Sequence, residues 1–195
     1  MGTLLWPRAT RNYPMEVNKM RLAIDIDGVL RDFCGALIAQ YKIDFPGHRV
    51  GFINQWELEH FFPIGKEIYE YAFNTRAQEI FEDADEFVGA MAFLKHLKEA
   101  GHHVALISSQ PNTKIIHTVN WITAHGAVYD SLVFTWEKGL FNYDILLDDA
   151  EKNLKNARDN GRRAVCFDQP YNENWDGERV KTYQEFLEIV DEISS

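Results

Sequence analysis

The chain has 195 residues, a formal net charge of −10 and an apolar fraction of 46%. This length can bury a core as one domain or as a domain with an insertion. The acidic balance argues against a nucleic-acid polymer as the main partner, because phosphate backbones are bound by clustered lysines and arginines. No run of residues reaches transmembrane length, and the two cysteines, Cys34 and Cys166, are expected to be buried apolar residues in a reducing, cytoplasmic compartment.

Residues 1–20 lack the long apolar centre of a signal peptide. Trp6 stands where a myristoylation signal needs Ser or Thr. We therefore expect residues 1–20 to be an N-terminal extension, and Met20 could itself be the natural first residue.

An apolar run over residues 22–30 is interrupted by two acids, Asp25 and Asp27, and then by Gly28. The short run predicts a buried strand of a parallel sheet. A buried carboxylate is costly unless it is paired, hydrogen-bonded or bound to a metal, so the acids should lie at the exit of the strand, where α/β sheets bind ligands. The other interpretation is an Asx-type turn in which both aspartates only cap the backbone.

Residues 32–85 are rich in aromatic side chains and show no strand alternation. The apolar spacing predicts a helix that includes Phe33 and ends before Phe45. Two or three short helices are expected after it, one near residues 54–61 and one over 63–73 with the proline in its first turn. Most of the aromatic residues should form a small core, and a few could wall a ligand.

From residue 85 onward, amphipathic helices alternate with apolar strands. Helices are expected from Asp85, as the residue that caps the first turn, to Gly101, and then over 113–125, 150–160 and 183–193. Strands are expected over 103–107, 132–134, 144–147 and 164–167. This alternation predicts an α/β fold, a Rossmann-like three-layer sandwich with a mainly parallel sheet and helices on both faces.

The carboxyl ends of the predicted strands should converge along one edge of the sheet. Polar residues at these ends could then share one site: Asp25, Asp27, Ser108 or Ser109, Lys138, Asp148 and Asp149. Mg²⁺ takes oxygen ligands and leaves positions for substrate phosphate, which makes Asp25 and Asp148 candidate ligands. Lys138 and a serine hydroxyl could hold phosphate, an aspartate could be the nucleophile, and Asp27 is placed to protonate a leaving alcohol.

Some of these residues also have a plainer interpretation. Asp149 could only cap the helix that follows it, and Lys138 could be an exposed lysine on a loop. Lys66 and Arg76 could contact phosphate, although solvated positions are more common for such residues. The loop over residues 168–177 is expected to be a packed surface loop near the site.

The order of these residues resembles the four motifs of the haloacid dehalogenase-like phosphohydrolases: Asp25-Ile26-Asp27-Gly28-Val29-Leu30, then Ser109 after an apolar strand, Lys138, and Leu147-Asp148-Asp149. Within that superfamily the chain is most similar to the 5′(3′)-deoxyribonucleotidases. This similarity rests on residues 25–33, 107–111 and 143–149, and above all on Phe167-Asp-Gln-Pro-Tyr-Asn172. It is weak in the aromatic region.

The resemblance implies a role for each of seven residues. They are Asp25 as nucleophile and metal ligand, Asp27 as general acid/base and as a metal ligand through its backbone carbonyl, Asp148 as third protein ligand of Mg²⁺, Asp149 as its support, Ser109 and Lys138 as phosphate-binding residues, and Phe33 as the aromatic that packs on the base. The resemblance also implies a core domain of residues 21–31 and 86–195 and a small helical cap, residues 32–85, inserted after the first strand.

The chain departs from the family pattern at a residue pair and at one further residue. Ser109-Gln110 stands where the family has a Thr-Ser pair before proline, which leaves the register between Ser108 and Ser109 open. Arg31 stands where family members often carry a small residue, and we expect it to contact substrate or solvent.

The sequence therefore predicts a magnesium-dependent phosphatase that hydrolyses (deoxy)nucleoside monophosphates through an aspartyl-phosphate intermediate. One alternative keeps the chemistry but changes the substrate to another small phosphomonoester or a nucleic-acid phosphate end. A second alternative is a non-catalytic nucleotide-binding module. The expected partner is a small nucleotide, with no nucleic-acid polymer and no membrane, and a homodimer remains open.

Overall fold

The computed structural model describes residues 18–194, so most of the expected N-terminal extension lies outside the described residues. One sheet of parallel strands runs in the order β3-β2-β1-β4-β5-β6. The strands are β1 (Arg21–Ile24), β2 (His103–Ser108), β3 (Ser131–Phe134), β4 (Ile145–Asp148), β5 (Arg163–Phe167) and β6 (Arg179–Val180). The predicted α/β class with a parallel sheet is confirmed. The sequence analysis missed β6, which has only two residues.

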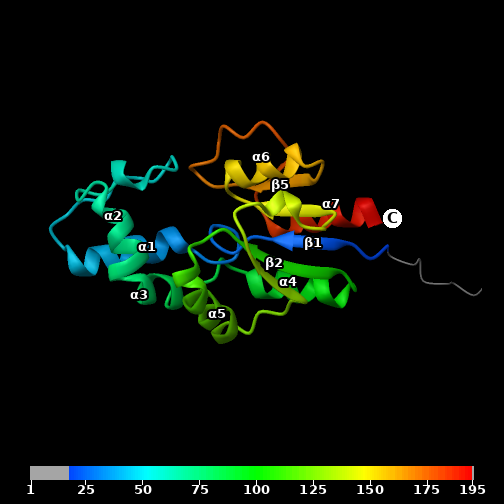
Figure 1. Ribbon diagram of the computed structural model, residues 1–195, viewed down its shortest axis with the longest axis horizontal. Helices are drawn as coiled ribbons and strands as arrows, with labels where there is room; N and C mark the ends of the chain where they lie inside the picture. The colour runs from blue at the N-terminus through cyan, green and yellow to red at the C-terminus, as the bar shows by residue number, and fades with distance from the viewer. Residues whose placement is uncertain (1–17, 195) are drawn as a thin grey trace, which may run out of the picture.

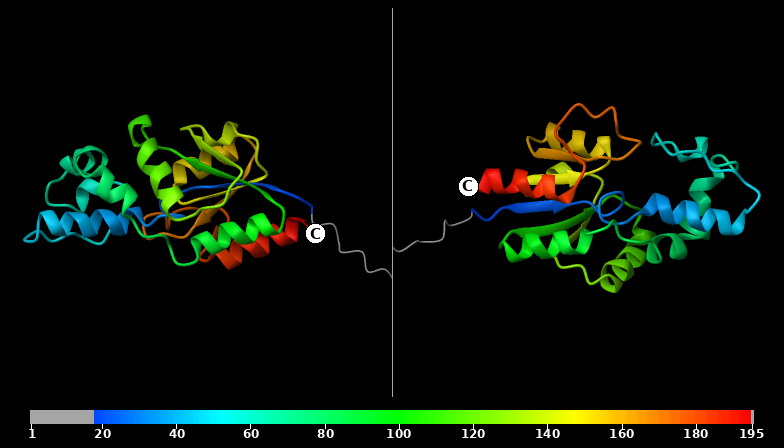
Figure 2. Two further views of the ribbon diagram at one scale, coloured as in Figure 1. Left: turned by 90° about the horizontal axis from the view of Figure 1, so that it is seen from below. Right: turned by 180° about the vertical axis from the view of Figure 1, so that it is seen from behind.

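Helices cover both faces of the sheet (Figure 1). They are α4 (Ala90–Glu99), α5 (Ile115–Ala124), α6 (Glu151–Asp159) and α7 (Tyr183–Ser194). Side chains of α4, α5 and α7 join one hydrophobic cluster with Leu22 and Ile24 of β1, whereas α6 packs with Ala23 on the opposite face. Figure 2 shows α4 and α7 side by side against the sheet. Because neighbouring positions of β1 point to opposite faces, this short strand lies at the centre of both cores.

A helical insertion follows β1 and extends beyond the carboxyl end of that strand (Figure 1). Its elements are α1 (Phe33–Asp44), a 3₁₀ turn (Leu58–His60), α2 (Glu67–Glu70), a π-helical turn (Tyr71–Thr75) and α3 (Ala77–Glu82). Most of its aromatic residues form a separate hydrophobic cluster, as the sequence predicts. We refer to residues 33–82 as the helical insertion.

Two predicted helices of the insertion are wrong in extent. The helix expected near residues 54–61 is only the single 3₁₀ turn, and the one expected over 63–73 begins at Glu67. Gly65 has φ +56°, a left-handed conformation that interrupts any helix starting at Pro63. Aromatic packing, rather than a regular helical repeat, therefore sets the course of this segment.

The helix predicted to start at Asp85 begins later, at Ala90. Gly89 has φ +89° immediately before α4, so the preceding residues cannot continue the helix. Glu86, rather than Asp85, accepts a hydrogen bond from a backbone N–H of the first turn, that of Met91 at 3.2 Å. Within residues 18–194, every helix is too short or too polar to cross a bilayer.

Candidate active site

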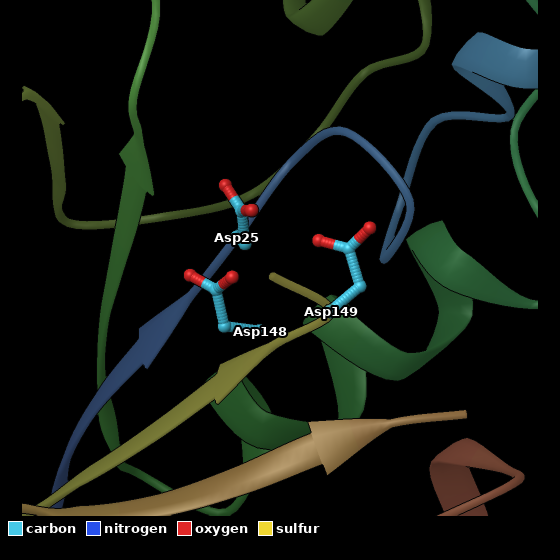
Figure 3. A group of neighbouring side chains, drawn as sticks. All are labelled: Asp25, Asp148 and Asp149. Carbon is cyan, nitrogen blue, oxygen red and sulfur yellow. The ribbon is translucent and has the colours of Figure 1, made fainter. Parts of the chain in front are cut away.

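Three aspartate side chains meet where β1 and β4 end. Asp25 follows β1 directly, Asp148 is the last residue of β4, and Asp149 comes next. One carboxylate oxygen from each lies within 4.8 Å of the others, and all three residues are buried. Figure 3 shows the three side chains near one another, with their carboxyl groups pointing in the same general direction. The parallel sheet thus brings together residues that are more than a hundred positions apart.

Lys138 bridges two of these three aspartates. Its Nζ is 2.9 Å from Asp25 Oδ1 and 2.6 Å from Asp148 Oδ2, and the side chain is completely buried. The interpretation of Lys138 as an exposed loop residue is therefore wrong. Three carboxylates against one ammonium leave an excess of two negative charges when all are ionised. A divalent cation would neutralise this excess.

The pKa values of the cluster point to the same imbalance. Burial, and then the charge of Asp148, raise the pKa of Asp25 well above its usual value. Burial and the charge of Asp148 likewise raise the pKa of Asp149 to about 7. Burial alone would lower the pKa of Lys138, but the charges of Asp148 and Asp25 outweigh it and raise that pKa. Carboxylates that resist ionisation in this way fit a divalent-cation site, because a bound cation favours their charged form.

Local hydrogen bonds hold the Asp148 carboxylate in place. Its Oδ1 accepts from the backbone N–H of Ala150 at 2.9 Å, and both oxygens accept from Nδ2 of Asn153, at 3.1 and 3.2 Å. Asn153 comes from α6, one turn beyond the strand end. Asn153 was not predicted as a site residue. The available signal in the sequence was its position about one helical turn after the acidic pair.

The loop over residues 168–177 supports Asp149. The hydroxyl of Tyr171 donates to Asp149 Oδ2 at 2.5 Å, and Nδ2 of Asn172 donates to the Asp149 carbonyl at 2.8 Å. The residue that precedes α6 is Ala150, and no side chain caps the first turn of this helix. The interpretation of Asp149 as a helix cap is therefore wrong. The loop is thus more than the packed surface loop expected from sequence, because it positions an acid of the cluster.

Gly28 makes this close packing possible. It has φ +75°, and a Cβ at this position would lie 2.0 Å from Asp149 Oδ2 and 2.7 Å from the Tyr171 hydroxyl. Its carbonyl accepts a hydrogen bond from Nε2 of Gln169 at 2.7 Å. The turn after β1 therefore requires glycine, both for its backbone conformation and for the space beside the acids.

Asp27 turns toward the start of the helical insertion. Its Oδ1 accepts from Nε of Arg31 at 2.8 Å. Arg31 is fully buried, so the expectation that it contacts solvent is wrong. The bend of the chain after Gly28 brings the guanidinium back to Asp27 instead.

A cavity of about 680 Å³ lies between the acids and the helical insertion. Asp25, Asp27, Ser108 and Ser109 line it on the sheet side, and Phe33 lines it on the other side. Phe33 stacks on Phe73, with ring centroids 5.7 Å apart, and is tilted against Phe81 at 5.3 Å. The cavity therefore has an acidic floor and an aromatic wall.

The hydroxyl of Ser109 donates to the carbonyl of Thr135 at 2.8 Å. This places Ser109, rather than Ser108, in a strand-end hydrogen bond to the backbone, and both serines remain on the cavity wall. Arg76, a weaker candidate for phosphate binding, forms ion pairs with Asp44 and Glu79 inside the helical insertion.

Comparisons with known proteins show which family this chain belongs to. Residues 18–193 match the model of the family described as 5′ nucleotidase, deoxy (pyrimidine), cytosolic type C protein. A curated relative from Chlorobaculum tepidum, named "Putative 5′(3′)-deoxyribonucleotidase", is 25% identical over 190 residues, which cover 92% of this chain and 94% of the relative.

Solved structures show the same fold. A haloacid dehalogenase-like family hydrolase from Streptococcus pneumoniae has a TM-score of 0.62 at 13% identity, covering 88% of this chain and 98% of the other. A magnesium-bound Bacillus subtilis protein described as a HAD-hydrolase has a TM-score of 0.59 at 11% identity, covering 89% and 99%. At these identities the likeness concerns the fold alone.

Proposed function

Because the chain belongs to the family of cytosolic type C 5′-nucleotidases, which are phosphomonoesterases of the haloacid dehalogenase type, we propose that it is a magnesium-dependent phosphatase of (deoxy)nucleoside monophosphates. Pyrimidine deoxynucleotides are the first substrates to test, because the description of the family names them. The same description supports the expected cytoplasmic location. The observation that carries the proposal is the buried cluster of three carboxylates and Lys138, of which Asp25 and Asp149 line an aromatic-walled cavity.

Asp25 is the proposed nucleophile. Its Oδ1 is already engaged by Lys138 Nζ at 2.9 Å and by the backbone N–H of Ile26 at 2.8 Å. We therefore assign the attack to Oδ2, which forms a bond to phosphorus while the bond between phosphorus and the nucleoside oxygen breaks. The product of this step is an aspartyl phosphate and a free nucleoside.

Asp27 is the proposed general acid/base. It gives its proton to the leaving nucleoside oxygen in the first step and takes a proton from the attacking water in the second. The second step cleaves the aspartyl phosphate, releases inorganic phosphate and restores both carboxyl groups. The position of Asp27 on the cavity wall, two residues after Asp25, supports this division of roles.

The remaining residues hold the reacting groups. Asp25, Asp148 and the backbone carbonyl of Asp27 would hold Mg²⁺, with Asp149 in support, and the ion would supply positive charge against the phosphate oxygens. Lys138 and Ser109 would bind further phosphate oxygens. The charge excess of the cluster and the raised pKa of Asp25 support a divalent ion here.

We further propose that residues 32–85 act as a cap over a core formed by residues 21–31 and 86–195. The separate hydrophobic cluster of the insertion and its aromatic contribution to the cavity wall support this division. The nucleoside would lie between the two parts, with Phe33 against the base.

Phosphate release from a panel of substrates tests the proposal. The panel contains the 5′- and 3′-monophosphates of deoxyribo- and ribonucleosides, sugar phosphates and a 5′-phosphorylated oligonucleotide, each with Mg²⁺ and with EDTA. We expect turnover that needs Mg²⁺, favours nucleoside monophosphates and is lost in Asp25→Asn. Equal rates on sugar phosphates would overturn the substrate class, and nucleotide binding without turnover would favour a non-catalytic module.

A further inference from the structure

Arg31 is a buried cation that touches the proposed acid/base. Its Nε lies 2.8 Å from Asp27 Oδ1 and its Nη2 lies 3.0 Å from Asp27 Oδ2, so the guanidinium grips both carboxylate oxygens. None of the Arg31 side chain is exposed, whereas 29% of the Asp27 side chain is. The fork fixes the plane of the Asp27 carboxylate from the protein side and leaves its other side toward the cavity.

The rest of the guanidinium is anchored to two different elements. Nη1 donates to the carbonyl of Phe81 in α3 at 3.0 Å, and Nη2 donates to Oγ1 of Thr118 in α5 at 3.0 Å. The rings of Phe81 and Trp121 lie 4.8 and 5.3 Å from the guanidinium carbon. Arg31 therefore joins the helical insertion, the core helix α5 and Asp27 at one point.

A hydrogen-bond chain leads from Arg31 to Gln110. The Arg31 guanidinium can only donate hydrogen bonds, so the Thr118 hydroxyl accepts one from it. The same hydroxyl donates a hydrogen bond to Gln110, with 3.0 Å between Thr118 Oγ1 and Gln110 Oε1. Thr118 therefore links the Arg31 guanidinium to the Gln110 side chain, which lines the cavity.

We propose that Arg31 is a positioning residue that holds the Asp27 carboxylate in the orientation needed to protonate the leaving nucleoside oxygen. This inference rests on the proposed function. Anchoring the two helices does not require contact with Asp27, so the grip on both Asp27 oxygens favours a role in positioning that carboxylate. A lysine could keep the charge but not the planar two-point grip.

The test compares two leaving groups in Arg31→Lys. A nucleoside oxygen needs a proton to leave, whereas p-nitrophenolate leaves without one. We therefore expect kcat/KM to fall about 10- to 100-fold for a nucleoside monophosphate and less than about 3-fold for p-nitrophenyl phosphate. We compare kcat/KM because this ratio depends only on the steps up to the first irreversible transfer, which is the loss of the leaving group. The later attack of water on the aspartyl phosphate does not affect it.

Four further variants complete the design. Arg76→Lys is the matched control, because Arg76 also grips a carboxylate at two points, that of Asp44, but inside the helical insertion; we expect little change on either substrate. The double variant Asp27→Asn/Arg31→Lys should lose no more activity than Asp27→Asn alone. Thr118→Val removes one anchor of the fork and should show the same selective loss at smaller size, which keeps the proposal testable if Arg31→Lys does not fold.

The outcomes are distinguishable. Equal losses on both substrates, or additive losses in the double variant, would overturn the role of Arg31 and leave the proposed function intact. A wild-type protein without activity on either substrate would overturn the proposed function itself.

Discussion

The rim of the sheet and the helical insertion both contain a buried or half-buried aspartate beside a cation, but the two environments have opposite effects. In the insertion, hydrogen bonds from Arg76, together with one from Tyr71, lower the pKa of Asp44. At the rim, burial and the charge of Asp148 raise the pKa of Asp25, although Lys138 lies 2.9 Å away. In the insertion, direct hydrogen bonds thus favour the charged form of the aspartate, whereas the rim has an excess of negative charge that favours a bound cation.

This comparison sets the expected direction of stability changes. A carboxylate with a lowered pKa adds stability above its unfolded pKa and loses it as the pH falls through the folded value. A carboxylate with a raised pKa costs stability when ionised, and the cost disappears as the pH falls. Removing the charge should therefore destabilise the insertion and should not destabilise the metal-free rim.

The largest expected effect is that of Asp25→Asn. Loss of the proposed nucleophile should reduce kcat by roughly 10⁴-fold or more, whereas the Tm in EDTA should stay the same or rise. In the matched variant Asp44→Asn, the Tm should fall and kcat should stay within a few-fold. A lower Tm for Asp25→Asn in EDTA would contradict the proposed charge imbalance at the rim.

Lys138→Met should have the next largest effect. It removes the one cation that contacts Asp25 and Asp148 in the described part of the chain, and leaving buried charges uncompensated costs about 3–5 kcal/mol. Urea unfolding in EDTA measures this loss. Added Mg²⁺ should raise the Tm of this variant more than that of the wild type, and no rise in either protein would argue against a cation at this site.

A change in the aromatic wall should affect binding more than chemistry. Phe33→Leu removes a ring from the cavity, and an aromatic contact of this kind contributes about 1 kcal/mol, or about 5-fold in KM. The control is Phe45→Leu, which alters a ring that packs on Tyr41 in the same insertion. Equal effects of the two variants on KM would show that Phe33 acts only through the insertion's core.

The smallest expected effect is on the pH dependence of stability. Because the folded pKa of Asp149 is about 7, above the ordinary value of an aspartate, the folded state binds this proton first as the pH falls. Metal-free protein should therefore gain about 1 kcal/mol of stability between pH 8 and pH 6 relative to Asp149→Asn. Chemical unfolding at several pH values in EDTA measures this difference, and a difference of opposite sign would contradict the raised pKa.

The sequence predicted the sheet better than the insertion for a physical reason. Short apolar runs such as 103–107 predict buried strands, and parallel strands place their carboxyl ends at one edge, which brings Asp25, Lys138 and Asp148 together. No comparable rule predicts the path of the chain through the insertion, because that path depends on aromatic packing. It also depends on single glycines such as Gly65, whose φ of +56° cannot be inferred from the periodicity of the sequence.

The sequence also did not predict which residues support the site. Arg31 is buried because Asp27, Phe81 and Thr118 surround it, and the last two come from distant helices. Tyr171 reaches Asp149 from a loop after another strand. Local patterns identified the charged residues that meet at the rim, but not the polar residues that orient them.

Binding of Mg²⁺ to the wild type and to Asp148→Asn, measured by titration calorimetry together with phosphate release from deoxyuridine 5′-monophosphate, tests the central claim most directly. We expect wild-type binding and Mg²⁺-dependent release, and a folded Asp148→Asn protein with binding weakened by about 10-fold or more and release lost with it. Undiminished release in EDTA, or unchanged Mg²⁺ binding by Asp148→Asn, would contradict the claim that the carboxylates at the sheet rim hold the catalytic cation.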